Sequence, residues 1–130
     1  MTVSELRVIF RVRDFQKSVH FYEDLLGMER FKSWDRPGEE PGIILRAGEG
    51  RTFELFGPLP GGEHDDCIAS GVEISMQVDV VDAWHDQLKA AGVPIARGLV
   101  DNPWGDRSFG IDDPDGVRLW FFQVIDLGRG

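Results

Sequence analysis

Two glutamates, Glu54 and Glu73, and one arginine, Arg7, carry the most evident chemistry in this sequence. Each stands on the polar side of a short segment in which polar and apolar residues alternate. A carboxylate placed in this way can bind a ligand cation, hold a divalent metal or act as a general base. The alternative is an ion pair with Arg7 that has a structural role alone.

Aromatic residues accompany these charges and could supply stacking area and cation–π contacts to a ligand. We expect a ligand to stack on five of them: Trp34, Phe56, Trp104, Trp120 and Phe122. Glu54, Glu73 and Arg107 would orient it. Aromatic side chains that simply fill the space as core are the competing interpretation, and Trp84, on a helical apolar stripe, is expected in the core.

These side chains must be positioned by strands and helices. The spacing of apolar residues predicts a similar set of these elements in each half of the chain. Alternation predicts strands at 6–12, 28–34, 43–47 and 51–56, and again at 72–78, after Val93, at 107–111 and at 117–124. Helical spacing predicts one helix from Phe15, capped by Asp14 and ended by Gly27. A second helix is capped by Asp79 or Asp82 and ended by Gly92.

The order of these elements repeats along the chain. Strand, helix, glycine stop, strand, loop and hairpin occur in both halves, which indicates an internal repeat of about 60 residues. The proline- and glycine-rich segment 58–71 is typical of a linker. The sequence therefore predicts an α+β fold with two tandem βαβββ modules, about 5–57 and 72–126, within a single domain 1–130.

Strand alternation also separates two faces. The apolar set should lie under the helices: Leu6, Val8, Phe10, Phe53, Leu55, Ile74, Met76, Val78, Leu119 and Phe121. The opposite, polar and aromatic set suits the lining of a binding site: Arg7, Arg11, Thr52, Glu54, Phe56, Glu73, Ser75, Gln77, Arg118, Trp120 and Phe122.

The bulk composition narrows the class of protein. The 130 residues, 42% hydrophobic and 28% charged, are ordinary for a globular domain, and the formal net charge of −9 argues against nucleic acid as a partner. No apolar run is long enough to span a membrane, and the charged N-terminus does not resemble a secretory signal. Cys67 is alone, so no internal disulfide forms and a cytoplasmic location is expected.

The three histidines lie off the strand positions that carry the polar set. We expect His20, His64 and His85 at the surface. The run His64-Asp65-Asp66-Cys67 has the composition of a metal site, but consecutive residues rarely converge on one ion.

Three segments carry a resemblance to a known family: SVHFYEDLLGM at 18–28, NPWG at 102–105 and DPDG at 113–116. With the duplicated βαβββ order, the chain resembles the vicinal-oxygen-chelate superfamily, the glyoxalase, bleomycin-resistance and extradiol-dioxygenase group, over about 6–124. The resemblance implies curved strands that form a cupped mixed sheet, with helices outside and a ligand or metal inside. It also implies a homodimer.

Metal-binding members of that family place His, Glu or Gln on four inward strand positions, which match Arg7, Glu54, Glu73 and Trp120 here. Neither a guanidinium nor an indole offers a free lone pair to a metal. Two carboxylates alone make a poor site for zinc, nickel or iron. We therefore expect no metal cofactor, with Glu54 and Glu73 as weak candidates for a divalent ion, and expect Arg7 to replace the metal by bridging one or both glutamates.

The expected function is a metal-independent small-molecule binding protein that resembles the bleomycin-resistance proteins. It would sequester an aromatic or cationic ligand in an acidic aromatic cup. A metal-dependent lyase, isomerase or dioxygenase of the same superfamily is the alternative, so enzymatic activity stays open. A third hypothesis is an interaction module whose cup is filled by its own side chains.

Overall fold

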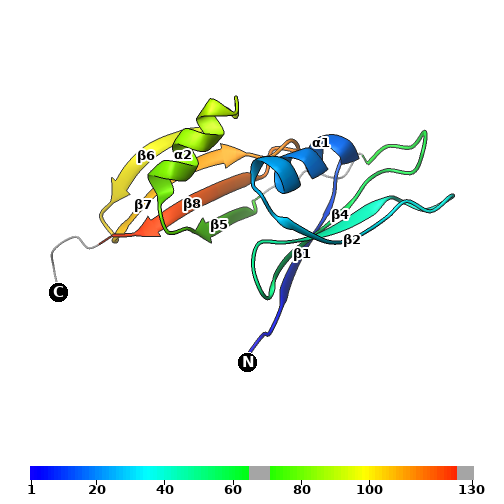
Figure 1. Cartoon of the computed structure of the whole chain (residues 1–130), viewed down its shortest axis with the longest axis horizontal. Coiled ribbons are helices and arrows are strands. Elements are labelled where there is room, and N and C mark those ends of the chain that lie inside the picture. Colours follow the sequence, from blue (N-terminus) through cyan, green and yellow to red (C-terminus); the bar gives the residue numbers. More distant parts are fainter. Residues whose placement is uncertain (65–70, 126–130) are drawn as a thin grey trace. The chain divides into compact units, whose positions relative to one another are not determined.

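The computed structural model describes residues 1–64 and 71–125 (Figure 1). It divides the chain into two units, residues 1–68 and 69–130, and the division falls within the proline- and glycine-rich segment 58–71. We call these units module 1 and module 2. No helix within the described residues combines the length and apolarity that crossing a membrane requires.

Module 1 is a four-stranded sheet with one helical segment along one face. Its strands are ordered β1-β4-β3-β2, with β1 parallel to β4 and the other pairs antiparallel. In chain order the elements are β1 (Leu6–Arg11), α1 (Phe15–Val19), η1 (His20–Leu25), β2 (Glu29–Trp34), β3 (Gly42–Arg46) and β4 (Arg51–Phe56).

Module 2 repeats this topology. Its strands are ordered β5-β8-β7-β6, and again only the pair that contains the first strand, β5 with β8, is parallel. Its elements are β5 (Glu73–Gln77), α2 (Val81–Ala90), β6 (Arg97–Asn102), β7 (Asp106–Asp112) and β8 (Arg118–Val124). The predicted α+β class and the tandem βαβββ order are confirmed.

The helix of module 1 begins as predicted but does not stay regular. The Asp14 side chain caps it by accepting a hydrogen bond from the backbone N–H of Lys17 at 3.1 Å. From His20 the helix widens into a π-helix, in which the N–H of Leu26 donates to the carbonyl of Phe21. Gly27 follows at φ 73°, a left-handed conformation that glycine adopts without strain.

The cap of α2 differs from the prediction. Val80, rather than Asp79 or Asp82, stands at the cap position and makes no side-chain cap. The first free N–H, that of Val81, donates instead to the side-chain oxygen of Gln123 on β8 at 3.0 Å. The cap is therefore supplied by a strand of the sheet, a tertiary contact that local sequence could not reveal.

The core of each module lies between its helix and the covered face of its sheet. In module 1, Tyr22 is fully buried and its ring meets Phe53 at 5.3 Å. In module 2, Phe109 and Phe121 stack in parallel with ring centres 5.0 Å apart. Leu6, which the alternation assigned to this covered face, is 67% exposed at the start of edge strand β1.

Candidate functional site

Each sheet has a second face, away from its own helix, and this face carries most of the residues predicted to bind a ligand. We call it the helix-free face. Strand register places three rows across it in module 1. The rows are Arg7, Thr52, Arg46 and Glu29; Ile9, Glu54, Ile44 and Lys32; and Arg11, Phe56, Gly42 and Trp34.

Arg7 and Glu54 form an ion pair on the helix-free face of module 1. The Arg7 Nη1 donates to Glu54 Oε1 at 3.2 Å, and Nη2 donates to Glu5 at 2.8 Å. The Glu5 carboxylate, and after it that of Glu54, raises the pKa of Arg7. The Glu54 side chain is 13% exposed, so most of its environment is protein rather than water. The predicted pairing of Arg7 with Glu54 is thus present in the structure.

Trp120 and Glu73 form the corresponding pair in module 2. The indole Nε1 donates to Glu73 Oε1 at 2.5 Å. The ring lies against Gly110, where an added Cβ would come within 3.1 Å of two indole carbons. The guanidinium of Arg118, held by Asp112, lies 5.5 Å from the indole centre. Glycine, carboxylate and guanidinium together fix the orientation of this ring.

The two pairs occupy equivalent positions of the repeat. Arg7 pairs in register with Thr52, two residues before Glu54, and Glu73 pairs with Arg118, two residues before Trp120. In module 1 the edge strand supplies the donor and the central strand supplies the carboxylate. In module 2 these roles are reversed. Each module therefore satisfies its own carboxylate with a neighbouring donor.

This donor set does not fit the metal that the family resemblance implies. Arg7 and Trp120 have only N–H donors at two of the four positions, and each of the two glutamates already accepts a hydrogen bond from one of them. Among residues 1–64 and 71–125, no three His, Cys, Asp or Glu side chains come together as a metal-binding group. We therefore assign no step of any reaction to a metal here.

Trp34 and Phe56 form an aromatic pair at one end of the same face of module 1. Their ring centres are 5.7 Å apart at 63°. The indole lies directly on Gly42, because a Cβ at this position would overlap it. Both rings are half-buried, so each keeps accessible area that a ligand could stack on.

The helix-free face of module 2 adds Asp106 and Ser108, which the sequence did not single out, beside Asn102 and the predicted Trp104. The Asn102 side-chain amide donates to Asp106 at 2.7 Å and to Ser108 at 2.9 Å. Trp104, 75% exposed, donates its Nε1 to the other oxygen of Asp106 at 3.1 Å. Ser108 is the register partner of Phe122, so the cluster adjoins the predicted aromatic surface. The signal that was missed is the strand register, which sequence alternation does not give.

Arg107 does not join these residues. It lies on the covered face of module 2, the face of Phe109, and donates to Asp82 of α2 at 2.7 Å and to Asp101 of β6 at 2.9 Å. The guanidinium lowers the pKa of Asp82, chiefly through this hydrogen bond. Both partners hold Arg107 between helix and sheet, so we leave it out of the candidate site.

The histidines differ from their predicted surface positions in two cases. His20 is exposed and pairs with Asp24. The His64 side chain is only 9% exposed and contacts the carbonyl oxygen of Val12 at 3.1 Å and Glu40 at 2.5 Å, so it ties the loop before β3 to the end of β1. His85 packs edge-on against Phe109 at 5.3 Å. The other residues of the run 64–67 lie outside the described residues.

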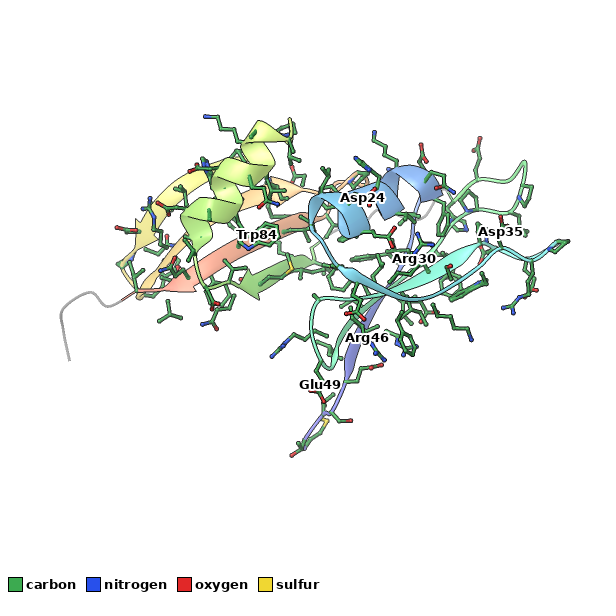
Figure 2. The ribbon with its side chains drawn as sticks, viewed as in Figure 1. Asp24, Arg30, Asp35, Arg46, Glu49 and Trp84 are labelled. Atoms are coloured by element: carbon green, nitrogen blue, oxygen red, sulfur yellow. The ribbon has the colours of Figure 1, made fainter. Side chains whose placement is uncertain are left out.

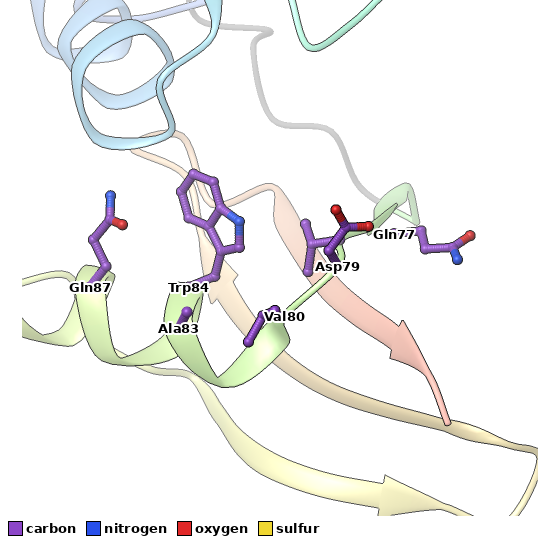
Figure 3. Close-up of a pocket in the computed structure, with 7 residues that line it drawn as sticks. Gln77, Asp79, Val80, Ala83, Trp84 and Gln87 are labelled. Carbon is purple, nitrogen blue, oxygen red and sulfur yellow. The ribbon is translucent and has the colours of Figure 1, made fainter. Parts of the chain in front are cut away.

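A pocket of about 390 Å³ lies beside the start of α2 (Figure 3), and its lining includes Gln77, the register partner of Phe122. Asp79 is the one ionisable side chain of its lining, and Trp84 forms one wall, while the same indole packs against Phe121 at 5.7 Å. A ligand site needs several polar groups that converge on one molecule. The pocket lining also carries polar side chains, Gln77, Asp79 and Gln87. We keep the helix-free faces as the candidate site because they carry the aromatic and charged residues that the sequence predicts to bind a ligand.

The Arg7–Glu54 pair gives a test of these contacts. We expect Arg7→Ala to lower the melting temperature by a few degrees, because the half-buried Glu54 loses its hydrogen-bonding cation. Thermal unfolding of the single and double variants measures the coupling. In a Glu54→Gln background the same substitution should have a clearly smaller effect; equal losses in both backgrounds would mean that the pair does not contribute.

Comparisons with known proteins agree with this architecture. The model of the Glyoxalase/Bleomycin resistance protein/Dioxygenase superfamily matches residues 6–121. Lactoylglutathione lyase of Salmonella typhimurium is 25% identical over 129 residues, 96% of each chain. TnmS3, an antibiotic binding protein from Streptomyces sp. CB03234, superposes with a TM-score of 0.73 at 21% identity, over 95% of this chain and 96% of its own.

A glyoxalase I mutant from Zea mays superposes with a TM-score of 0.79 at 23% identity, over 94% of this chain but 45% of the maize chain. The family match covers most of the sequence, and the solved structures share its fold. The chain belongs to the Glyoxalase/Bleomycin resistance protein/Dioxygenase superfamily.

Proposed function

We propose that this protein is a small-molecule binding protein that recognises an aromatic ligand without a metal, in the manner of the bleomycin-resistance branch of its superfamily. The observation that carries this proposal is that both glutamates already accept a hydrogen bond within the protein. Glu54 accepts from Arg7, and Glu73 accepts from Trp120. Glu54 and Glu73 would have to lose these hydrogen bonds before they could coordinate a metal ion. In their present contacts they give a binding surface its shape and charge.

Stacking would supply most of the affinity. Trp34 and Phe56 in module 1, and Trp120 and Phe122 in module 2, present half-buried rings on the helix-free faces, and Trp104 adds an exposed ring beside Asp106. Burial of about 300 Å² of apolar ligand surface at about 25 cal/mol per Å² contributes several kcal/mol before the entropy of binding is subtracted. Stacking therefore supplies a large part of the binding free energy without any metal.

Charge would set the orientation of the ligand. On module 2, Glu73 and Asp106 accept hydrogen bonds from indole N–H groups, which places negative charge beside aromatic rings and favours a ligand with a cationic group. The predicted acidic character belongs to this module. The helix-free face of module 1 carries Arg7, Arg11, Lys32 and Arg46 against Glu29 and Glu54, so it is not acidic.

Catalysis is the competing function, because the curated relatives are named lactoylglutathione lyases. It would require Glu54 and Glu73 to leave Arg7 and Trp120 and hold a metal. Elemental analysis of the dialysed protein, followed by an assay for lactoylglutathione formation with Ni²⁺ or Zn²⁺ added, separates the two functions. We expect neither stoichiometric metal nor activity; tightly held metal at one ion per chain would overturn the proposal.

Ligand binding itself is tested by a panel of neutral, cationic and anionic aromatic compounds. Binding to Trp34, Trp104 or Trp120 should change tryptophan fluorescence and raise the melting temperature. If no compound of a broad panel does either, an interaction module without a small ligand becomes the better reading. A homodimer and a cytoplasmic location stay predictions of the sequence.

A further inference from the structure

The helix-free face of module 1 holds cationic side chains that no carboxylate among the described residues pairs with. Arg7 is committed to Glu5 and Glu54. Arg11, Lys32 and Arg46 share this face, and none of the three forms an ion pair with a carboxylate among the described residues. In a chain of formal net charge −9, such a concentration of unpaired cations is not expected from composition.

Arg46 is the cation whose geometry is best defined. Its guanidinium carbon lies 3.7 Å from the centre of the Phe31 ring, and Phe31 is itself 52% exposed (Arg46 is labelled in Figure 2). Stacking occupies the flat face of a guanidinium and leaves its N–H groups free in the plane. No acceptor within the described residues takes them, and Glu29, opposite Arg46 in register, makes no ion pair with it. The Phe31 ring therefore holds the guanidinium, and no described residue accepts hydrogen bonds from it.

Thr52 supplies a second, independent observation beside Arg46. It is the register partner of Arg46 on one side and of Arg7 on the other. Thr52 is 1% exposed, and its Oγ1 has no hydrogen-bond partner among the described residues. Buried hydroxyls are almost always hydrogen-bonded, because an unpaired one is destabilising. A hydroxyl left unpaired between two arginines is suited to donate to a bound acceptor.

We propose that Arg46 and Thr52 form the binding site for an oxyanion group of the ligand, a carboxylate or a phosphate. The Arg46 fork donates two parallel hydrogen bonds to two oxygens of the anion. The Thr52 hydroxyl donates a third, which requires neighbouring side chains to move, because its oxygen is covered in the ligand-free protein. This inference rests on the proposed function, since it names the chemical group that the helix-free face of module 1 receives. The group recognised on the face of module 1 is therefore anionic, whereas the face of module 2 favours a cationic group.

The test uses three probes that share one aromatic ring: benzoate, phenyl phosphate and the neutral benzyl alcohol. Isothermal titration calorimetry of the full chain should detect binding of at least one anion and weaker binding of the alcohol. Arg46→Gln should weaken anion binding about tenfold or more. Arg46→Lys keeps the charge but loses the fork, so its anion affinity should lie between those of the parent protein and Arg46→Gln. Preference for benzoate assigns a carboxylate site, and preference for phenyl phosphate assigns a phosphate site.

Arg51→Gln is the matched control, because Arg51 is an exposed arginine of the neighbouring strand β4, directly before Thr52, and alternation places it on the opposite face. It should leave anion binding unchanged. Thr52→Val keeps the side-chain shape but removes the hydroxyl, so it should weaken anion binding without lowering the melting temperature of the ligand-free protein. If Thr52 has a purely structural role, Thr52→Val should lower both the anion affinity and the melting temperature.

Equal anion affinity in Arg46→Gln and the parent protein would overturn the site, as would equal binding of benzyl alcohol and benzoate. The proposed function fails differently. It fails if stoichiometric metal is found or if the aromatic surface binds nothing in the wider panel. Binding of aromatic compounds that does not depend on Arg46 would leave the proposed function standing and remove only the oxyanion site.

Discussion

Replacement of Asp113 by alanine is expected to lower the free energy of unfolding of module 2 by about 3 kcal/mol. Asp113 is 6% exposed, and its Oδ1 accepts hydrogen bonds from the backbone N–H groups of Asp115 and Val117, both at 2.9 Å. Hydrogen bonds to a charged acceptor contribute about 1.5–3 kcal/mol each. Alanine would also leave the N–H of Val117, itself 2% exposed, unpaired in the core.

Urea unfolding followed by circular dichroism measures this effect, and Asp113→Asn is the matched control. Asparagine keeps one acceptor oxygen at the same place without the charge, so it should lose clearly less stability than alanine. The turn between β7 and β8 aligns Gly110 with Trp120. A variant with alanine at 113 that stays within about 0.5 kcal/mol of the parent would show that the turn forms without this carboxylate.

The turn itself could be predicted from the sequence, whereas the role of Asp113 in it could not. Pro114 and Gly116 mark a turn because of their backbone preferences, which are local properties. Burial of Asp113 depends on the strands that meet around it, and only the folded module shows that. The same division holds at α2, whose end at Gly92 was predicted and whose cap, supplied by Gln123, was not.

Strand faces could be predicted from alternation, but neighbours across strands could not. Alternation placed Glu54 and Thr52 on the polar face, as the structure does. It could not place Arg46 beside Thr52, since the register of β3 on β4 depends on the length of the turn between them. A register shift between Arg30 and Lys32 also interrupts the alternation of β2, so the sequence does not show on which face of the sheet Phe31 lies. Phe31 is the ring on which Arg46 stacks.

Arg107 shows the limit of inference from residue type. A lone arginine after a turn of aromatic and polar residues is compatible with ligand binding and with a structural ion pair. Asp82 and Asp101, its two partners, lie 25 and 6 residues away in the chain, on a helix and on a neighbouring strand. Only the packing of α2 on the sheet brings these three charges together, so the structural role follows from the fold.

Trp120→Ala is expected to weaken binding of the aromatic ligand by about 30-fold or more, which corresponds to about 2 kcal/mol. The indole is held by Gly110 beneath it and by the Glu73 carboxylate at its N–H, so little orientation entropy would be lost when a ligand stacks on it. Removal of the ring would delete the stacking surface and leave Glu73 without its donor. Because Trp120 is only half-buried, its loss should destabilise the protein less than Asp113→Ala.

Titration of an aromatic compound from the panel, followed by calorimetry or by the fluorescence of the remaining tryptophans, measures the change. Trp120→Phe separates the two roles of the side chain, since it keeps an aromatic ring but loses the N–H to Glu73. If stacking dominates, phenylalanine should retain most of the affinity; if the fixed carboxylate dominates, it should bind as weakly as alanine. Unchanged affinity in both variants would place the ligand away from Trp120, and with it away from the repeat-equivalent pair on which the proposed function depends.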